Sequence, residues 1–339
     1  MNILGIESSC DETACAIISA NKNDTSVKLL SQTVTASMPL HAKTGGIIPE
    51  NAAREQLKYI LPIVKKTLKD ATMQFSDIDA FAVTYGPGLI GSLLVGVETA
   101  KTFSFVFNKP LVPINHLIGH IYANWVDRKT AIEFLAIALI VSGGHTDLIL
   151  MKKHGSIQWL GGTRDDAAGE ALDKIGRLLG LPYPAGPAIE EKAKKGNPKT
   201  FRFKSPMIDS HDFDFSFSGL KTAVLKEVQK IKRLDEQIVS DIAYAVQVAI
   251  FDVLIAKTTK AAKQYNTKSI LLGGGVSANK TLRTAFEQYA IAHELSAKIF
   301  APQKFLCTDN AAMIATAAFF NYNKVPWQKL TADPKLYFN

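Results

Sequence analysis

The sequence repeats one pattern, an apolar strand that runs directly into a turn of small or hydroxyl residues. Strand-like runs end in such turns near Ser8, Gly86, Ser142 and Gly273. Glycine in a turn lets the backbone approach a ligand closely, and exposed N–H groups there bind phosphate oxygens. One such turn is an ordinary connection between a strand and a helix. Four in one chain indicate a nucleotide held between two lobes.

Two of these turns share a longer arrangement of strand, turn, acidic residue and second strand. Asp11 follows the first turn and Asp147 follows the third. This doubling predicts two related halves that face a shared cleft. No turn reads G-x-G-x-x-G before an acidic strand end, and none reads G-x4-G-K-[ST], which disfavours Rossmann and P-loop folds. The layout is that of the α/β, two-lobed, actin-like and sugar-kinase-like ATPase superfold, with an interlobe nucleotide cleft. This superfold does not by itself fix function.

The length of 339 residues suits about two domains. Strand-rich segments start near Ile3 and Leu135, and the helix that begins near Asn310 is expected to return to the first lobe. We therefore predict a first lobe of residues 1–131 and 305–339, and a second lobe of residues 132–304. Helical patterns are predicted at residues 52–70, 89–103, 168–179, 219–231, 235–264, 279–293 and 310–322. The pattern at 235–264 predicts core scaffold.

Composition places the chain among ordinary globular proteins, with 47% hydrophobic and 21% charged residues. Cys10, Cys15 and Cys307 are odd in number and lack C-x-x-C spacing, which argues against a disulfide framework and for a reducing compartment. No stretch resembles a membrane span, and no signal segment precedes the strand at Ile3. These features predict a cytoplasmic protein that does not enter the membrane.

Positive charge is concentrated in residues 189–233, which hold 11 Lys and Arg against 6 Asp and Glu in a chain of net charge +8. Basic residues in this segment alternate with Phe201 and Phe203. A charge run is commonly a solvated helix face. The alternative is an acidic partner such as a nucleic acid, since Lys and Arg contacts to phosphate supply most sequence-independent affinity.

His116 and His120 are four residues apart, after a strand-like run that contains two prolines. On a helix, this spacing puts both rings on one face, close enough to hold one metal ion, although two core histidines would look the same. Asp309 precedes the last predicted helix, where its simplest role is an N-cap. A zinc peptidase of the H-E-x-x-H type is excluded, because Leu117, Ile118 and Gly119 leave no glutamate between the histidines.

Ten segments fall in the order of one known family, residues 6–13, 45–50, 86–89, 116–120, 141–146, 166–174, 183–187, 215–221, 274–279 and 309–310. On these segments the chain resembles the bacterial TsaD/Gcp proteins, tRNA threonylcarbamoyladenosine transferases formerly called sialoglycoprotein endopeptidases. The resemblance runs from Ile3 to about Phe320. It departs at Gln56, where the family often has His, at Leu172 for Phe, at Ala185 for Gly and at Glu190 for Asp.

The resemblance implies that His116, His120 and Asp309 hold one divalent metal ion, with Fe²⁺ favoured and Zn²⁺ the alternative. His41 and His145 are other candidates, expected as neighbours of the site or substrate contacts. The implied donor is threonylcarbamoyl-AMP, bound through the backbone of Ile140, Val141, Ser142, Gly143 and Gly144. Asp173 and Glu190 would bind ribose hydroxyls, Gly186 would allow close approach, and Asn279 would position the adenylate.

The implied reaction moves the threonylcarbamoyl group to the exocyclic amine of the adenosine 3′ to the anticodon and releases AMP. The substrates would be tRNAs that read codons beginning with adenine. Asp11 or Glu12 is the candidate base, and phosphate-loop geometry is the alternative role of these two acids. Implied partners are an inactive paralogue of the same fold (TsaB-like) and a P-loop ATPase (TsaE-like). The competing hypotheses are a small-molecule kinase of the same superfold and a non-catalytic, nucleotide-gated scaffold.

Overall fold

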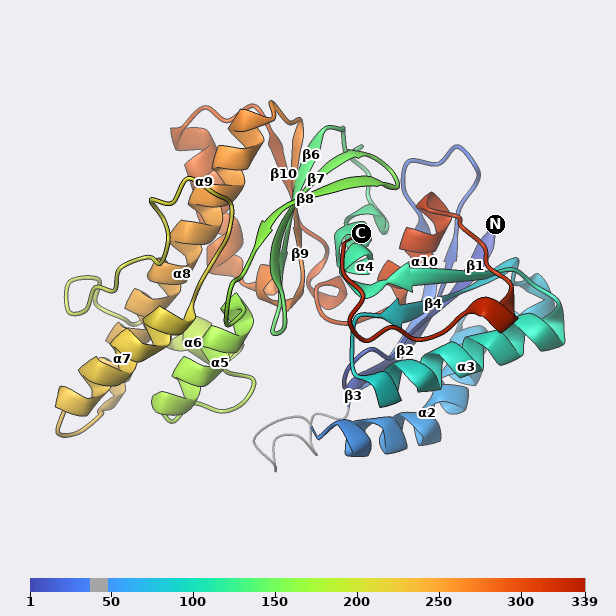
Figure 1. Ribbon diagram of the computed structural model, residues 1–339, viewed down its shortest axis with the longest axis horizontal. Coiled ribbons are helices and arrows are strands. Elements are labelled where there is room, and N and C mark those ends of the chain that lie inside the picture. The colour runs from blue at the N-terminus through green and yellow to red at the C-terminus, as the bar shows by residue number, and fades with distance from the viewer. Residues whose placement is uncertain (37–47, 339) are drawn as a thin grey trace. The chain divides into compact units, whose positions relative to one another are not determined.

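A computed structural model describes residues 1–36 and 48–338 (Figure 1). His41 and the residues Gly45, Gly46 and Ile47 of the glycine motif lie outside the described residues. The chain divides into two compact units, one formed by Met1–Ile132 and Pro302–Asn339 and the other by Glu133–Ala301. Each unit contains a five-stranded sheet covered by helices.

In its described residues, the first unit contains β1 to β5, four helices and several short 3-10 turns. Its strands are β1 (Asn2–Glu7), β2 (Glu12–Ser19), β3 (Lys28–Ala36), β4 (Ala80–Gly86) and β5 (Leu111–Asn115). Its helices are α2 (Pro49–Asp70), α3 (Ile90–Phe107), α4 (His116–Tyr122) and α10 (Ala311–Phe320). The short turns are η1 (Phe75–Asp77), η2 (Ala123–Trp125), η4 (Lys304–Leu306) and η5 (Trp327–Lys329).

The second unit contains β6 to β10 and five helices. Its strands are β6 (Ala136–Val141), β7 (Thr146–Lys153), β8 (Ser156–Gly162), β9 (Ser269–Gly273) and β10 (Lys298–Phe300). Its helices are α5 (Ala168–Leu178), α6 (Ala185–Ala193), α7 (Ser218–Lys230), α8 (Glu236–Gln264) and α9 (Lys280–Ala292), with the 3-10 turn η3 (Gly275–Ala278) before α9.

The two sheets have the same topology. The order is β3-β2-β1-β4-β5 in the first unit and β8-β7-β6-β9-β10 in the second. In each, an antiparallel three-stranded meander is extended by two parallel strands. The predicted repeat of one arrangement, a strand followed by a turn and a second strand, is therefore confirmed. Strands β1 and β6 occupy equivalent places in their sheets, and each ends at one of the two similar turns.

The sheet of the first unit is covered on both faces, which explains its apolar central strand. Leu4 and Ile6 of β1 are fully buried in one cluster with residues of α2 and α3. Gly5 points to the opposite face, where a Cβ atom would lie 2.5 Å from the carbonyl oxygen of Ala311. Only glycine permits this approach, so α10 lies directly on β1. Residues near the start of α10 are thereby brought to the end of β1.

The predicted helices are present with differences of a few residues at their ends, and α4 and α6 are additional helices. Two helices, Ile90–Phe107 and Glu236–Gln264, are long and apolar enough to cross a membrane by length and composition alone, a test that core helices of globular proteins also pass. The apolar window of Glu236–Gln264 is 78% buried inside the protein, which agrees with the predicted core scaffold.

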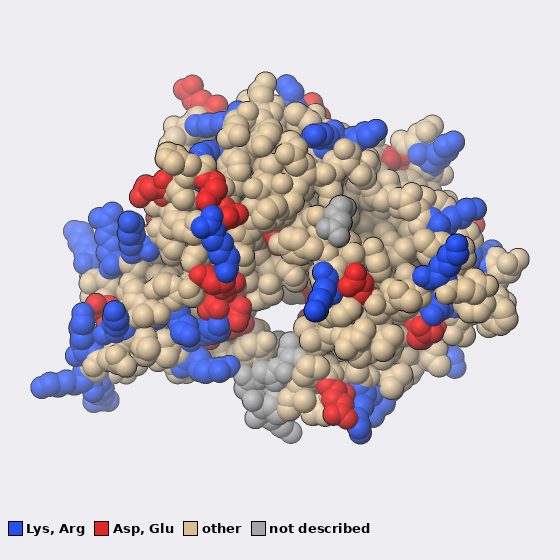
Figure 2. Space-filling model, viewed as in Figure 1, with Lys and Arg blue, Asp and Glu red and all other residues tan. Residues whose placement is uncertain are grey.

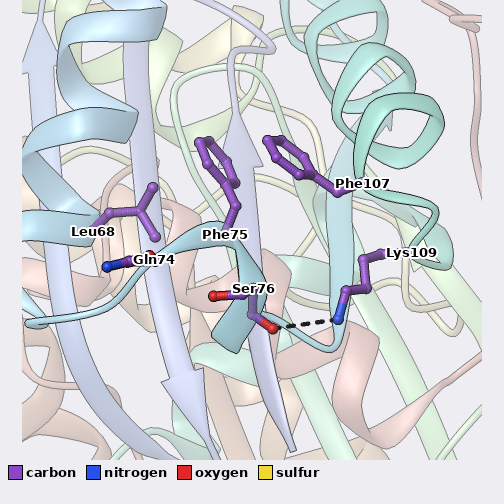
Figure 3. Close-up of a pocket in the computed structure, with 6 residues that line it drawn as sticks. All are labelled: Leu68, Gln74, Phe75, Ser76, Phe107 and Lys109. Atoms are coloured by element: carbon purple, nitrogen blue, oxygen red, sulfur yellow. Dashed lines mark hydrogen bonds between the residues drawn. The ribbon is translucent and has the colours of Figure 1, made fainter.

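A hollow of about 480 Å³ lies on the first unit beside η1 (Figure 3). Figure 3 shows the rings of Phe75 and Phe107 close together, stacked 4.2 Å apart, and Lys109 extending toward Ser76. The Lys109 amine donates to the carbonyl oxygen of Ser76 at 3.4 Å. These residues precede β4 and β5, so the hollow lies at the amino ends of the parallel strands. Ligands of α/β sheets bind at the carboxyl ends.

Lys257 is a buried lysine of α8, only 1% exposed. Its amine donates to Ser210 Oγ at 2.6 Å, to the Asp212 carbonyl at 3.3 Å and to the Asp214 carbonyl. Lys257 Nζ also lies 5.7 Å from the centre of the Phe215 ring. Burial lowers the pKa of Lys257, and the Asp212 carboxylate, with Oδ1 3.3 Å from the amine, opposes this shift. Lys257 therefore fixes residues 210–215 against the core of the second unit.

We predict that Lys257→Met lowers the free energy of unfolding of the second unit by about 2–3 kcal/mol, because it leaves several carbonyl and hydroxyl groups without their donor. Lys260→Met is the matched control. Lys260 lies on the same helix and donates to the carbonyls of Ser210 and His211, but it is exposed. The control should cost about 0.5 kcal/mol or less. Urea unfolding measures both, and equal losses would contradict the role assigned to Lys257.

Candidate metal centre and donor-binding turn

His116 and His120 lie on one face of α4, which starts directly after β5. The Asn115 side chain caps this helix by accepting from the Leu117 N–H at 2.8 Å. The two imidazole rings are 4.7 Å apart at their centres. Asp309 Oδ1 lies 3.5 Å from His116 Nε2 and 3.2 Å from His120 Nε2. One potential ligand atom from each of the three residues lies within 4.8 Å of the others, so the structure brings the predicted set together.

Asp309 is not the N-cap of the last helix. The neighbouring Asn310 caps α10, since its side-chain oxygen accepts from the Met313 N–H at 2.9 Å. Asn310 also donates to the carbonyls of Leu306 and Thr308, which fixes the segment before the helix. The capping alternative for Asp309 was therefore wrong, because the adjacent amide performs that role and the Asp309 carboxylate is directed to the histidines.

The chemistry of the three side chains fits a divalent metal ion. His120 is 1% exposed, and neither of its ring nitrogens has a hydrogen-bond partner among the described residues. Its Nε2 is close to Asp309 but lacks the alignment of a hydrogen bond. A buried polar group without a partner is costly, and a bound ion would satisfy this nitrogen. Two imidazoles and one carboxylate leave coordination positions open and suit Fe or Zn.

Glu7 holds His116 from the side opposite the ligand nitrogen. Its fully buried carboxylate accepts from His116 Nδ1 at 3.0 Å, from Thr84 Oγ1 at 2.5 Å and from the Ser9 N–H at 2.6 Å. Ser9 Oγ also lies 3.1 Å from His116 Nδ1. A proton held on Nδ1 directs Nε2 toward Asp309, as carboxylates commonly do for metal-binding histidines. The sequence argument missed Glu7, although its position at a strand end facing α4 was a usable signal.

The pKa of His116 reflects the same neighbours. Burial lowers this pKa, but the charges of Asp309 and Glu7 and the Glu7 hydrogen bond outweigh burial and raise it to about 9. A divalent ion bound at Nε2 would replace the proton there and gain from the same two carboxylates.

The turn after β1 carries Asp11 and Glu12, the candidate bases. Gln56 of α2 is fully buried and donates to the carbonyls of Cys10 at 3.1 Å and Glu12 at 3.0 Å, so the residue that departs from the family pattern fixes this turn. Burial raises the pKa of Glu12 well above its usual range, and repulsion from Asp309 and Asp11 adds to this effect. The same causes raise the pKa of the Cys10 thiol, which keeps it protonated.

The donor-binding turn predicted at Ile140–Gly144 lies at the carboxyl end of β6 in the second unit. The Ser142 N–H donates to the His145 carbonyl, and the Ser142 carbonyl accepts from the Gly169 N–H of α5. Gly143 and Gly144 are exposed, and a Cβ atom on either would meet nothing within 4 Å. The turn is therefore anchored at Ser142 and open at its glycines. His145 belongs to this unit, whereas His116, His120 and Asp309 belong to the first.

The other predicted donor contacts lie on elements next to this turn. Asp173 of α5 accepts a hydrogen bond from the Ala185 N–H at 2.6 Å. Burial raises the pKa of Asp173, although backbone hydrogen bonds from Ala185 and Gly186 act to lower it. Glu190 of α6 accepts from the Lys280 N–H at 2.8 Å, one residue after Asn279. Asn279 caps α9 through the Leu282 N–H. Gly186 has open space where a side chain would be. Glu190, which departs from the family pattern, is thus held by the backbone N–H of the residue that follows Asn279.

The fold and the site together describe an α/β protein of the actin-like superfold with a two-histidine, one-carboxylate centre. HypF of T. kodakarensis shares the fold, with a TM-score of 0.62 and 13% identity over 94% of this chain and 47% of that chain. The predicted fold class is confirmed.

Sequence comparisons identify the family within this class. Residues 28–316 match the family described as TsaD, tRNA N6-adenosine threonylcarbamoyltransferase, and the chain belongs to it. A protein of that name from Syntrophomonas wolfei is 47% identical over 98% of this chain and 95% of its own length. Another, from Bacillus subtilis, is 45% identical over 96% of this chain and 91% of its own.

We predict that Glu7→Gln weakens divalent metal binding by about 10- to 100-fold. The glutamine side chain has one acceptor oxygen and one NH₂ group in place of two acceptor oxygens. Its NH₂ group would face the Ser9 N–H or the Thr84 hydroxyl, so at least one hydrogen bond of the network is lost. Competition with a chelating dye, using Zn²⁺ and Fe²⁺, measures the affinity. Glu98→Gln, on the exposed side of α3, is the matched control and should bind like the wild type. Unchanged affinity in Glu7→Gln would show that the carboxylate does not orient His116.

Proposed function

We propose that this chain is the tRNA N6-adenosine threonylcarbamoyltransferase of its cell. It transfers the threonylcarbamoyl group from threonylcarbamoyl-AMP to the adenosine 3′ to the anticodon of tRNAs that read codons beginning with adenine, and releases AMP. The observation that carries the proposal is the centre of His116, His120 and Asp309, with both histidines buried, in a chain that belongs to this family.

The residues have distinct roles in this proposal. The open turn at Ser142, Gly143 and Gly144 binds the donor through backbone N–H groups, and Asp173 and Glu190 take its ribose hydroxyls. Asp11 or Glu12 accepts the proton of the exocyclic amine, which is a poor nucleophile without a base. Glu12 lies near enough to Asp309 for its pKa to respond to that charge, which supports its place at the metal centre.

The enzyme is proposed to depend on one divalent ion per chain, held by His116, His120 and Asp309. Fe²⁺ is the favoured ion and Zn²⁺ the alternative. When bound, the ion would supply Lewis acidity to the carbamoyl carbonyl or an anchor for the threonyl group. Glu7 and Ser9 hold the His116 ring in place for this task.

The protein is proposed to act in the cytoplasm with an inactive TsaB-like paralogue and a TsaE-like P-loop ATPase. Adjacent helices α2 and α3 of the first unit support a protein partner (Figure 1). Leu57 and Leu61 on α2, and Ile90 and Leu94 on α3, are between 44% and 64% exposed. Four large apolar side chains at i, i+4 spacing on two packed helices are typical of a surface that another protein covers.

We predict that the purified chain, with its partner subunits, unmodified tRNA and threonylcarbamoyl-AMP, yields threonylcarbamoyladenosine and AMP. Mass spectrometry of digested tRNA and chromatography of the nucleotides measure the two products. If ATP is instead hydrolysed with phosphate transfer to a small alcohol, and the tRNA stays unmodified, a kinase of the same superfold replaces this proposal. A chain that binds nucleotide without either reaction would be a scaffold.

We predict that His116→Ala combined with His120→Ala lowers bound metal far below one ion per chain and abolishes transfer. Each substitution removes an imidazole ligand, and the remaining carboxylate cannot hold a divalent ion tightly. Elemental analysis gives the metal content, and circular dichroism tests the fold. His154→Ala, which removes a histidine of the second unit, is the control and should keep the metal. Full metal occupancy in the double variant would make the pair ordinary core histidines.

A further inference from the structure

The second unit carries a groove of about 730 Å³ between the segment 200–204 and the last turns of α7. Phe201 and Phe203 form its apolar part and pack against the core of the unit. Four of the other lining residues are basic, Arg202, Lys204, Lys226 and Lys230, and the rest are Thr200, Ala223, Glu227 and Gln229. The groove therefore combines aromatic surface with cations from two different elements.

The cations of this groove are largely uncompensated. Glu227 is the only acidic side chain in its lining, and it pairs with Lys230 at 2.7 Å. Within residues 1–36 and 48–338, Arg202, Lys204 and Lys226 take part in no ion pair. Burial raises the pKa of Asp252, and the charge of Arg202 lies near enough to oppose this rise. Figure 2 shows Lys and Arg gathered on the side of the unit where Figure 1 places α7.

Two other lysines of residues 189–233 already have acidic partners. Lys192 pairs with Glu236 at 2.7 Å, and Lys194 pairs with Glu191 at 2.5 Å. These two lysines are therefore less available to an anion than Arg202, Lys204 and Lys226 of the same segment. The groove brings those three exposed charges together beside a partly aromatic lining.

We infer that this groove binds the phosphate backbone of RNA. The inference rests on the proposed function, which supplies a tRNA as the polyanion. The groove is lined by the C-terminal half of α7, so it lacks the N–H groups of a helix N-terminus that small phosphates prefer. Separate Lys and Arg side chains along an open groove suit successive phosphates of a nucleic acid strand. Phe201 and Phe203 add apolar surface for riboses or unstacked bases.

The test is the double charge reversal Lys204→Glu with Lys226→Glu, which alters the groove and leaves the candidate donor and metal residues intact. At about 0.1 M salt, the Kd for unmodified tRNA should rise about tenfold or more. The slope of log affinity against log salt should fall by about 1.4–1.8, which is 0.7–0.9 for each lost phosphate contact. Fluorescence anisotropy with the full chain over a salt series measures both quantities.

The matched control is Lys152→Glu with Lys153→Glu, which makes the same change in net charge at the exposed end of β7. Its tRNA affinity should stay near that of the wild type. Lys204→Arg with Lys226→Arg keeps the charges and should retain binding. Equal losses in the groove variant and the β7 control, or no loss in either, would overturn the inference. The inference would also be overturned by a groove variant that loses binding to anionic vesicles but not to tRNA. That result would make the groove a membrane-binding surface.

Transfer assays separate this inference from the proposed function. With partner subunits and donor, the groove variant should show a raised KM for tRNA and a kcat near that of the wild type. If the wild type modifies tRNA and the groove variant has an unchanged KM, the RNA groove is wrong and the transferase stands. If the wild type binds tRNA through the groove but makes no threonylcarbamoyladenosine, the proposed function fails and the groove stands.

Discussion

The candidate centre depends on one buried carboxylate, that of Glu7. A fully buried carboxylate is costly unless its oxygens are hydrogen-bonded, and Glu7 has donors from the turn after β1, from Thr84 of β4 and from His116 of α4. These donors come from three elements that meet only because β1, β4 and β5 are neighbours in the sheet. The strand order is thus a requirement of the site, and Gly5 contributes by letting α10 approach the same strand.

The two units show how one topology supports two kinds of chemistry. In the first unit, the turn after the central strand is rich in carboxylates and is held by Gln56, so it is closed and anionic. In the second, the equivalent turn is anchored at Ser142 and leaves Gly143 and Gly144 open. Carboxylates and imidazoles suit a cation, whereas open backbone N–H groups suit phosphate. In the proposed function, the sequences of the two turns therefore divide metal and donor binding between the units.

Much of this was predictable from the sequence, and the failures have physical causes. Helix spacing and the resemblance to one family located His116 and His120, and the doubled pattern predicted the repeated sheet topology. The sequence could not show whether Asp309 or Asn310 caps the last helix. Both residue types are good N-caps, and the choice depends on backbone dihedral angles. Helix α6 was missed because Pro184, Gly186 and Pro187 at its start are typical of a turn. Glu7 was missed because its partners are far away in the sequence.

The distribution of positive charge is a further property that the sequence predicts only in part. A basic run predicts where cations are abundant, but affinity for an anion depends on which cations lack a partner. Lys192 and Lys194 are ion-paired, and Lys257 is buried as a structural donor. Lys204 and Lys226, 22 positions apart, line one groove because α7 packs beside the segment 200–204. A surface ion pair contributes little to stability, but it removes charge from an interface. The available positive surface is therefore a property of the fold, and the groove could be found only there.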